Sequence, residues 1–130
     1  MDLMSTKNDS ALLINFWATW CKPCVSELPH FEAFHQKYAA KGIQVILVSL
    51  DDVKNANARI ARVVKEKSIL SPIYLLHEPD YNAWINKIDS SWSGSLPATL
   101  FLDKKKNKIG FYEKELSQEE LENIVKPFIQ

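Results

Sequence analysis

Residues 16–24 read FWATWCKPC, and this stretch holds both cysteines of the 130-residue chain, Cys21 and Cys24. It overlaps an apolar run, ALLINFW at Ala11–Trp17, which predicts a strand covered on both faces. A helix is predicted directly afterwards, over Cys24–Ala40, because apolar residues recur there at steps of three and four. The cysteines therefore mark the junction between a buried strand and a helix.

The elements expected after this junction follow the order of an α/β domain. The apolar run Ile43–Leu50 completes a strand–helix–strand unit, and an amphipathic helix is expected over roughly Lys54–Lys67. A short strand at Pro72–Glu78 and a short helix at Asp80–Ser90 come next, before a loose segment, SSWSGS. In the last third, Leu96–Asp103 and Lys108–Glu115 are predicted to form an antiparallel hairpin. Ser117 and Glu120 then form a capping box that opens a closing helix.

Length and composition are those of one compact domain, 1–130, in which we expect 1–10 to be a flexible segment. The 46% hydrophobic and 25% charged residues are typical of a soluble globular protein.

Lys plus Arg and Asp plus Glu each number 16, so no overall positive field attracts nucleic acid or an anionic membrane. The apolar runs are shorter than the roughly 20 residues of a membrane helix. The first residues lack the pattern of a signal peptide, and the lysines of 104–108 are interpreted as a solvated turn.

A zinc site is one alternative for the cysteines, because His30 and His35 follow them closely. Only five residues separate Cys24 from His30, whereas a zinc finger has roughly 12–15 between its ligand pairs. Cys24 and His30 would also lie on different faces of one helix, so no metal is expected. Burial in the core is a second alternative. It suits Cys24, which is in line with the apolar stripe, better than Cys21, which lies where the helix begins.

A redox pair accounts for both cysteines. The N-terminus of a helix presents unpaired N–H groups and the positive end of the helix dipole, so a thiol there ionises more readily than usual. Pro23 falls in the first turn, where its missing N–H costs nothing. A strand, an aromatic residue, Cys-x-Pro-Cys and a helix in this order predict a redox-active pair, Cys21–Cys24, without a further cofactor.

The motif WCKPC behind an apolar strand, together with LPATLFLD late in the chain, resembles the thioredoxin superfamily. The closer resemblance is to its TlpA/ResA-like branch of thiol–disulfide oxidoreductases, and it covers nearly the whole domain. Asn15 stands where ordinary thioredoxins carry a buried Asp, and Glu27 stands where the branch carries a functionally important Glu. The 72 residues between Cys24 and Pro97 leave room for an inserted helix and strand. The branch usually has a β-hairpin before the first strand, for which this chain is too short.

The resemblance implies a thioredoxin-like fold, with a mixed central sheet flanked by helices and the inserted helix–strand element before the proline strand. It also implies an enzyme that reduces protein disulfides. Cys21 would attack a substrate disulfide, and Cys24 would resolve the mixed disulfide by attacking Cys21. Glu27, one turn from Cys24, would exchange a proton with it. The alternative for Glu27 is a solvent-facing helix residue.

Substrate docking is expected at five residues around this pair. Pro97 would be a cis-proline facing the sulfurs, with the Leu96 backbone free to pair with an extended substrate segment. A trans loop proline is the alternative. Trp20 would cover the disulfide and shape the docking surface, to which Lys22 and Pro23 also contribute.

The expected partners are cysteine-containing proteins and an upstream thiol reductant, in an extracytoplasmic setting that is periplasmic or membrane-anchored. A disulfide oxidase or isomerase on the same fold is a rival, although such oxidases favour a histidine where this motif has Lys-Pro. A redox-inert binding module is another, and the intact cysteine pair with both prolines argues against it. A peroxidase would need Thr-x-x-Cys, but Thr19 lies only two positions before Cys21.

Overall fold

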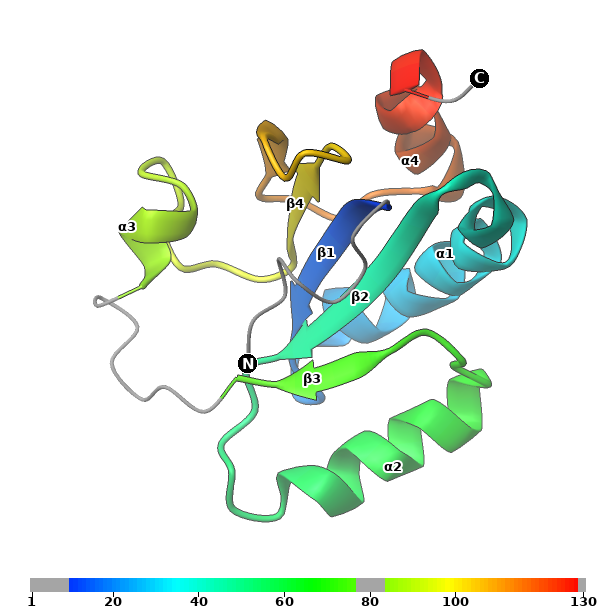
Figure 1. Ribbon diagram of the computed structural model, residues 1–130. Coiled ribbons are helices and arrows are strands. Elements are labelled where there is room, and N and C mark those ends of the chain that lie inside the picture. Colours follow the sequence, from blue (N-terminus) through cyan, green and yellow to red (C-terminus); the bar gives the residue numbers. More distant parts are fainter. Residues whose placement is uncertain (1–9, 77–83, 129–130) are drawn as a thin grey trace.

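The computed structural model describes residues 10–76 and 84–128, which form a five-stranded mixed sheet flanked by helices (Figure 1). The strand order is β3-β2-β1-β4-β5. The parallel strands are β1 (Ala11–Trp17), β2 (Ile43–Ser49) and β3 (Ile73–Leu75). The antiparallel strands are β4 (Ala98–Leu102), which pairs with β1, and β5 (Lys108–Tyr112). The mixed sheet and the antiparallel hairpin are therefore confirmed.

The helices connect these strands and cover both faces of the sheet. They are α1 (Lys22–Tyr38), α2 (Ala56–Lys67), α3 (Ile85–Ile88) and α4 (Gln118–Val125), with short 3₁₀ turns at Ala39–Lys41 and Lys126–Phe128. Apolar residues of α1, α2 and α4 pack against one face, whereas α3 and the segment after it pack against the other. The helix and strand expected before the late proline strand are present as α2 and β3.

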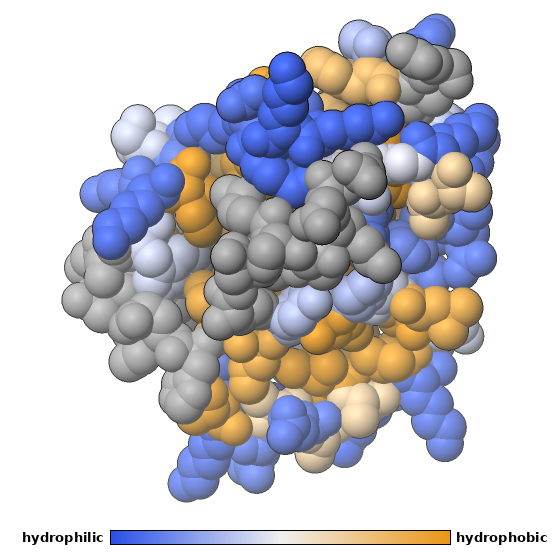
Figure 2. Space-filling model, viewed as in Figure 1, coloured by the Kyte–Doolittle hydropathy of each residue, from blue (hydrophilic) through white to orange (hydrophobic). Residues whose placement is uncertain are grey.

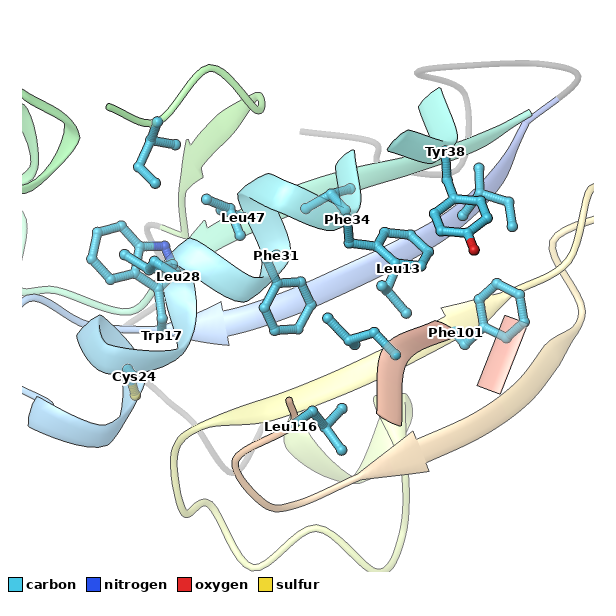
Figure 3. Close-up of a cluster of buried hydrophobic side chains, with 14 of the residues drawn as sticks. Leu13, Trp17, Cys24, Leu28, Phe31, Phe34, Tyr38, Leu47, Phe101 and Leu116 are labelled. Carbon is cyan, nitrogen blue, oxygen red and sulfur yellow. The ribbon is translucent and has the colours of Figure 1, made fainter. Parts of the chain in front are cut away.

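Strand β1 is buried along its whole length, because its alternate side chains enter two different hydrophobic clusters. On one side Leu13 and Trp17 lie beneath α1, close to Phe31 (Figure 3). On the other side Phe16 contacts Trp92, with ring centroids 5.0 Å apart. Each fully buried side chain of this size contributes roughly 1.5–3 kcal/mol. The carboxyl end of β1 is therefore a firmly held point from which the cysteine motif starts.

The expected boundaries hold for β1 and differ elsewhere by amounts that local chemistry explains. Helix α1 begins at Lys22, because Cys21 caps it. Helix α3 is shorter than the predicted Asp80–Ser90, since Asp89 already has extended backbone angles; residues 80–83 lie outside the described residues. Strand β3 is likewise shorter than Pro72–Glu78, whose last two residues are not described.

The segment SSWSGS contributes to the core, although the sequence marked it as loose. Trp92 within it is buried, and its indole N–H donates to the Ser95 carbonyl at 2.9 Å. By contrast, Lys104 and Lys105 in the β4–β5 turn are exposed. Figure 2 shows a hydrophilic area near the top of this face of the molecule. In the ranges 10–76 and 84–128, no helix is long and apolar enough to cross a membrane.

Helix α4 begins with the capping box that the sequence predicted. The Ser117 hydroxyl accepts the Glu120 N–H at 3.1 Å, and the Glu120 carboxylate accepts the Ser117 N–H at 3.0 Å. These bonds satisfy two donors that a helix start would leave unpaired. They also hold the chain beside Leu116, whose N–H donates to Glu27 in the candidate site.

We predict that Ser117→Ala lowers the free energy of unfolding by about 1 kcal/mol, since the cap at Glu120 is lost. Urea unfolding followed by far-ultraviolet circular dichroism measures the change. Ser26→Ala is the matched control, because Ser26 is exposed within α1 and caps nothing. An equal loss in both variants would contradict the assignment of the effect to the cap.

Candidate active site

The cysteine motif lies at the carboxyl end of β1, where the chain turns into α1. The Cys21 N–H donates to the Ala18 carbonyl at 3.1 Å and closes this turn. Cys21 is the N-cap of α1, and its Sγ accepts the Cys24 N–H at 3.3 Å. Pro23 lies in the first helical turn, as predicted. One sulfur therefore occupies the position where helix N–H groups and the helix dipole favour negative charge.

Cys21 and Cys24 form a disulfide, with their Cα atoms 5.2 Å apart. Cys24 is fully buried, at the start of the apolar face that α1 turns toward the sheet (Figure 3), whereas Cys21 keeps 6% of its surface exposed. The expected contrast between an accessible and a shielded sulfur is therefore small in the oxidised pair.

The Cys21–Cys24 disulfide also bears on the alternative that these cysteines bind zinc. Both cysteines are engaged with each other, while His30 is exposed and His35 is half-buried, with Nδ1 accepting the Val45 N–H at 3.3 Å. Over residues 10–76 and 84–128, no three His, Cys, Asp or Glu side chains gather as a metal site would need.

The residues expected to dock a substrate lie around the motif. Trp20 is 67% exposed, and Lys22 and Pro23 are exposed beside it. The Leu96–Pro97 peptide bond is cis. Because Phe16 of β1 pairs with Ala98 of β4, Pro97 lies next to the end of β1 where the motif starts.

The structure brings two of these residues to one cavity. Trp20 and Leu96 line a space of about 50 Å³ together with four residues from other segments: Leu50, Ile85, Trp92 and Gly94. The role of this surface in substrate binding stays a prediction.

Glu27 is fully buried, so it is not the solvent-facing residue of the alternative interpretation. Its Oε1 accepts a hydrogen bond from the Asn15 amide at 2.9 Å, and its Oε2 accepts the Leu116 N–H at 2.6 Å. Asn15 also donates to the Thr99 hydroxyl at 3.2 Å. The carboxyl group thus joins α1, β1 and the segment before α4, three residues along the helix from Cys24.

Burial raises the pKa of Glu27 to about 7, although the hydrogen bonds from Leu116 and Asn15 act in the opposite direction. The negative charges of Glu115 and Glu120 add to the increase. A carboxyl group with this pKa can take up or release a proton near neutral pH, which general acid–base catalysis needs. The proton exchange between Glu27 and Cys24 stays a prediction.

Asp51 is a site residue that no motif in the sequence marks. Its carboxylate accepts the Thr19 N–H at 3.1 Å, the Thr19 hydroxyl at 2.6 Å and the Ser49 hydroxyl at 2.6 Å. It therefore fixes the turn that leads to Trp20 and Cys21. The available signal was its position just after an apolar parallel strand, at the sheet edge where α/β proteins place their sites.

We predict that the free energy of unfolding falls as pH rises from about 4.5 to about 7, because folded Glu27 holds its proton there and the unfolded chain does not. The shift corresponds to about 3 kcal/mol, and Glu27→Gln should lose this part of the pH dependence. Urea unfolding of both oxidised proteins across this range measures the difference.

Glu32→Gln is the control for that experiment. Burial alone would raise the pKa of Glu32, but hydrogen bonds from Gln36 and Ser71 bring it below its usual value. The stability that Glu32 contributes is therefore lost as pH falls, so its removal should leave the decline toward pH 7 intact. Parallel curves for wild type and Glu27→Gln would contradict the prediction.

Residues 1–113 match the model of the AhpC/TSA family. The thiol-disulfide oxidoreductase ResA of a Bacillus cereus strain is 30% identical over 115 residues, which cover 88% of this chain and 61% of that protein. ResA of Oceanobacillus iheyensis is 40% identical over 99 residues, which cover 76% of this chain and 47% of that protein. The chain thus spans less than two thirds of the length of either relative.

Two solved structures show the same fold. A thioredoxin-family thiol:disulfide interchange protein from Chlorobium tepidum TLS has a TM-score of 0.79 at 23% identity, covering 95% of this chain and 83% of that one. A thioredoxin-related protein from Neisseria meningitidis serogroup B has a TM-score of 0.81 at 22% identity, covering 98% and 90%. With a thioredoxin-like fold and a match over 1–113, this chain belongs to the AhpC/TSA family.

Proposed function

We propose that this domain is a thiol–disulfide oxidoreductase that reduces disulfides in other proteins through Cys21 and Cys24. One arrangement carries the proposal: a disulfide at the N-terminus of α1, with the buried Glu27 carboxyl group one turn beyond it. The names of the ResA relatives support the same reaction class.

The reaction begins with the pair in its dithiol form. The Cys21 thiolate, which the Cys24 N–H and the helix dipole stabilise, attacks one sulfur of a substrate disulfide and releases the other as a thiolate. Glu27 then removes the Cys24 thiol proton, and the Cys24 thiolate attacks the Cys21 sulfur. The Cys21–substrate bond breaks and the second substrate thiolate leaves. The substrate gains two electrons, and Cys21–Cys24 becomes a disulfide.

Substrate binding is assigned to the surface around the exposed Trp20. Lys22 and Pro23 flank it on α1. Leu96 lines a cavity together with Trp20, and Pro97 follows Leu96 at the cis bond before β4. An extended substrate segment would pair with the Leu96 backbone, which brings the substrate disulfide beside Cys21.

Cysteine-containing proteins and an upstream thiol reductant are the proposed partners, since each turnover leaves the pair oxidised. The proposal places the domain outside the cytoplasm, tethered to a membrane in a longer protein or free in the periplasm. Disulfides form and persist in such compartments, so a dedicated reductant has substrates there.

We predict a reduction potential nearer the roughly −270 mV of thioredoxin than the roughly −120 mV of a strong oxidant such as DsbA. A strong oxidant stabilises its reduced form, whereas a carboxylate one turn from Cys24 disfavours a thiolate there. Equilibration with glutathione and dithiothreitol, followed by tryptophan fluorescence, measures it. A value above about −180 mV, in the isomerase range, would favour the oxidase or isomerase instead.

We also predict that Cys24→Ser accumulates mixed disulfides with protein substrates and that Cys21→Ser does not. In Cys24→Ser the Cys21 thiol can still attack a substrate disulfide, but no second thiol is present to resolve the mixed disulfide. In Cys21→Ser the remaining sulfur is the fully buried one. Non-reducing gels after incubation with insulin, and after export into a periplasm, would show the adducts. Equal trapping would contradict the assigned roles, and no trapping by either would favour a redox-inert module.

A further inference from the structure

Asn15 lies at the centre of the buried polar group beside the cysteines. It is fully buried in β1 opposite Thr99 of β4. Its Nδ2 donates to Glu27 Oε1 and to the Thr99 hydroxyl, as described above. Its Oδ1 is buried as well, and it finds no hydrogen-bond partner among the described residues. Buried amide oxygens are nearly always paired, so this one calls for an explanation.

The ionised and the protonated form of Glu27 need different hydrogen-bond partners. An ionised carboxylate only accepts hydrogen bonds, and the Asn15 amide and the Leu116 N–H supply one to each oxygen. A protonated carboxyl group must donate one. Because the Leu116 N–H occupies Oε2, the proton belongs on Oε1, which faces the NH₂ group of Asn15. Two donors would then face each other.

A half-turn of the Asn15 amide removes this conflict. The NH₂ group and the oxygen of an amide have nearly the same shape, so exchanging them needs no additional space. After the exchange Oδ1 accepts the Glu27 proton and also the Thr99 hydroxyl, which can donate as well as accept. The NH₂ group moves to the side where Oδ1 had no partner. Each orientation leaves one amide atom unpaired, so the carboxyl proton decides between them.

We propose that Asn15 is a positioning residue whose amide reorients with the protonation of Glu27, donating to the carboxylate and accepting from the carboxyl group. This inference rests on the proposed function. When the Cys24 thiol proton moves to Glu27, the Cys24–Cys21 bond forms and the substrate thiolate leaves. The amide then turns, so the new carboxyl proton gains an acceptor within the closed site. No water needs to enter.

The charged groups around Glu27 are consistent with a single titrating proton. Glu115 and Glu120 disfavour the ionised carboxylate, and Glu120 is itself paired with Lys114 at 3.3 Å. The pKa of about 7 means that both protonation states of Glu27 occur near neutral pH. Asn15 itself does not titrate, so it follows the proton without competing for it.

A titration of the oxidised wild-type protein tests the reorientation directly. Nuclear magnetic resonance would follow the Asn15 side-chain ¹⁵N and ¹H shifts and the Glu27 carboxyl carbon from about pH 5 to 9, around the expected midpoint. We expect both to change with one midpoint, and the Asn15 change to vanish in Glu27→Gln. A Glu27 carbon that titrates while the Asn15 amide shifts stay constant would overturn the proposal.

Kinetics test the consequence for catalysis. A reduced protein mixed with 5,5′-dithiobis(2-nitrobenzoate) releases one thionitrobenzoate when Cys21 attacks and a second when Cys24 resolves. In Asn15→Leu the carboxylate loses a hydrogen bond to its charged form, which is stronger than the bond that the neutral carboxyl group loses. The pH midpoint of the second release should therefore rise by about one unit. At pH 7 the base fraction would fall from about one half to about one tenth, a roughly fivefold slower release that recovers at higher pH.

Ser71→Ala is the matched control, because it removes a buried hydroxyl that bonds Glu32 rather than Glu27. An unshifted midpoint in Asn15→Leu, or an equal shift in Ser71→Ala, would overturn the proposal. If Asn15→Leu does not fold, Asn15→Asp replaces it, and the two carboxyl groups should split the profile into two steps. Absence of the second release even in wild type would instead count against the proposed function, and the titration would still decide the amide reorientation.

Discussion

The buried carboxyl group of Glu27 is the constraint on which the site depends. It links α1 to β1 through Asn15 and to the start of α4 through Leu116, which lies 89 positions away in sequence. Both partners are neutral donors, so they stabilise the carboxylate only in part, and burial dominates its pKa. An apolar residue of similar size would fill the space but leave the Asn15 amide and the Leu116 N–H without this acceptor. What the carboxyl group adds is a proton that can be exchanged near neutral pH, beside a buried cysteine.

The fold supplies the rigidity that such a group needs. Because β1 is covered on both faces, its carboxyl end is held firmly, and the motif continues from it without a flexible linker. Asp51, beyond the end of β2, binds both the N–H and the hydroxyl of Thr19 and so fixes the approach to Cys21. Pro97 enters the same edge from β4. The ends of β1 and β2 and the start of β4 thus meet at one edge of the sheet, where paired strands hold the start of the cysteine motif.

The sequence was sufficient for features that depend on local pattern. Periodicity located β1 and α1, and the helix start, the Pro23 position and the Ser117 cap follow from the chemistry of helix ends. The resemblance supplied the cis bond at Pro97. The Asn15–Glu27 contact was beyond reach, since it depends on how two elements pack and on side-chain orientation. Trp92 was missed for a related reason: an irregular segment has no periodicity to show that its aromatic residue fills the far face of the sheet.

The buried polar group beside Cys24 has a carboxyl group on the helix, Glu27, and a neutral amide on the strand, Asn15. Ordinary thioredoxins carry a buried Asp where this chain has Asn15. Here the acid is on α1, three residues from Cys24, so it shares a helix face with this buried cysteine. A second carboxyl group on β1 would couple to it and split the titration into two steps. An amide in that position is neutral, and it offers a donor and an acceptor of nearly equal shape. In the proposed reaction the helix residue moves the proton while the strand residue adapts to it.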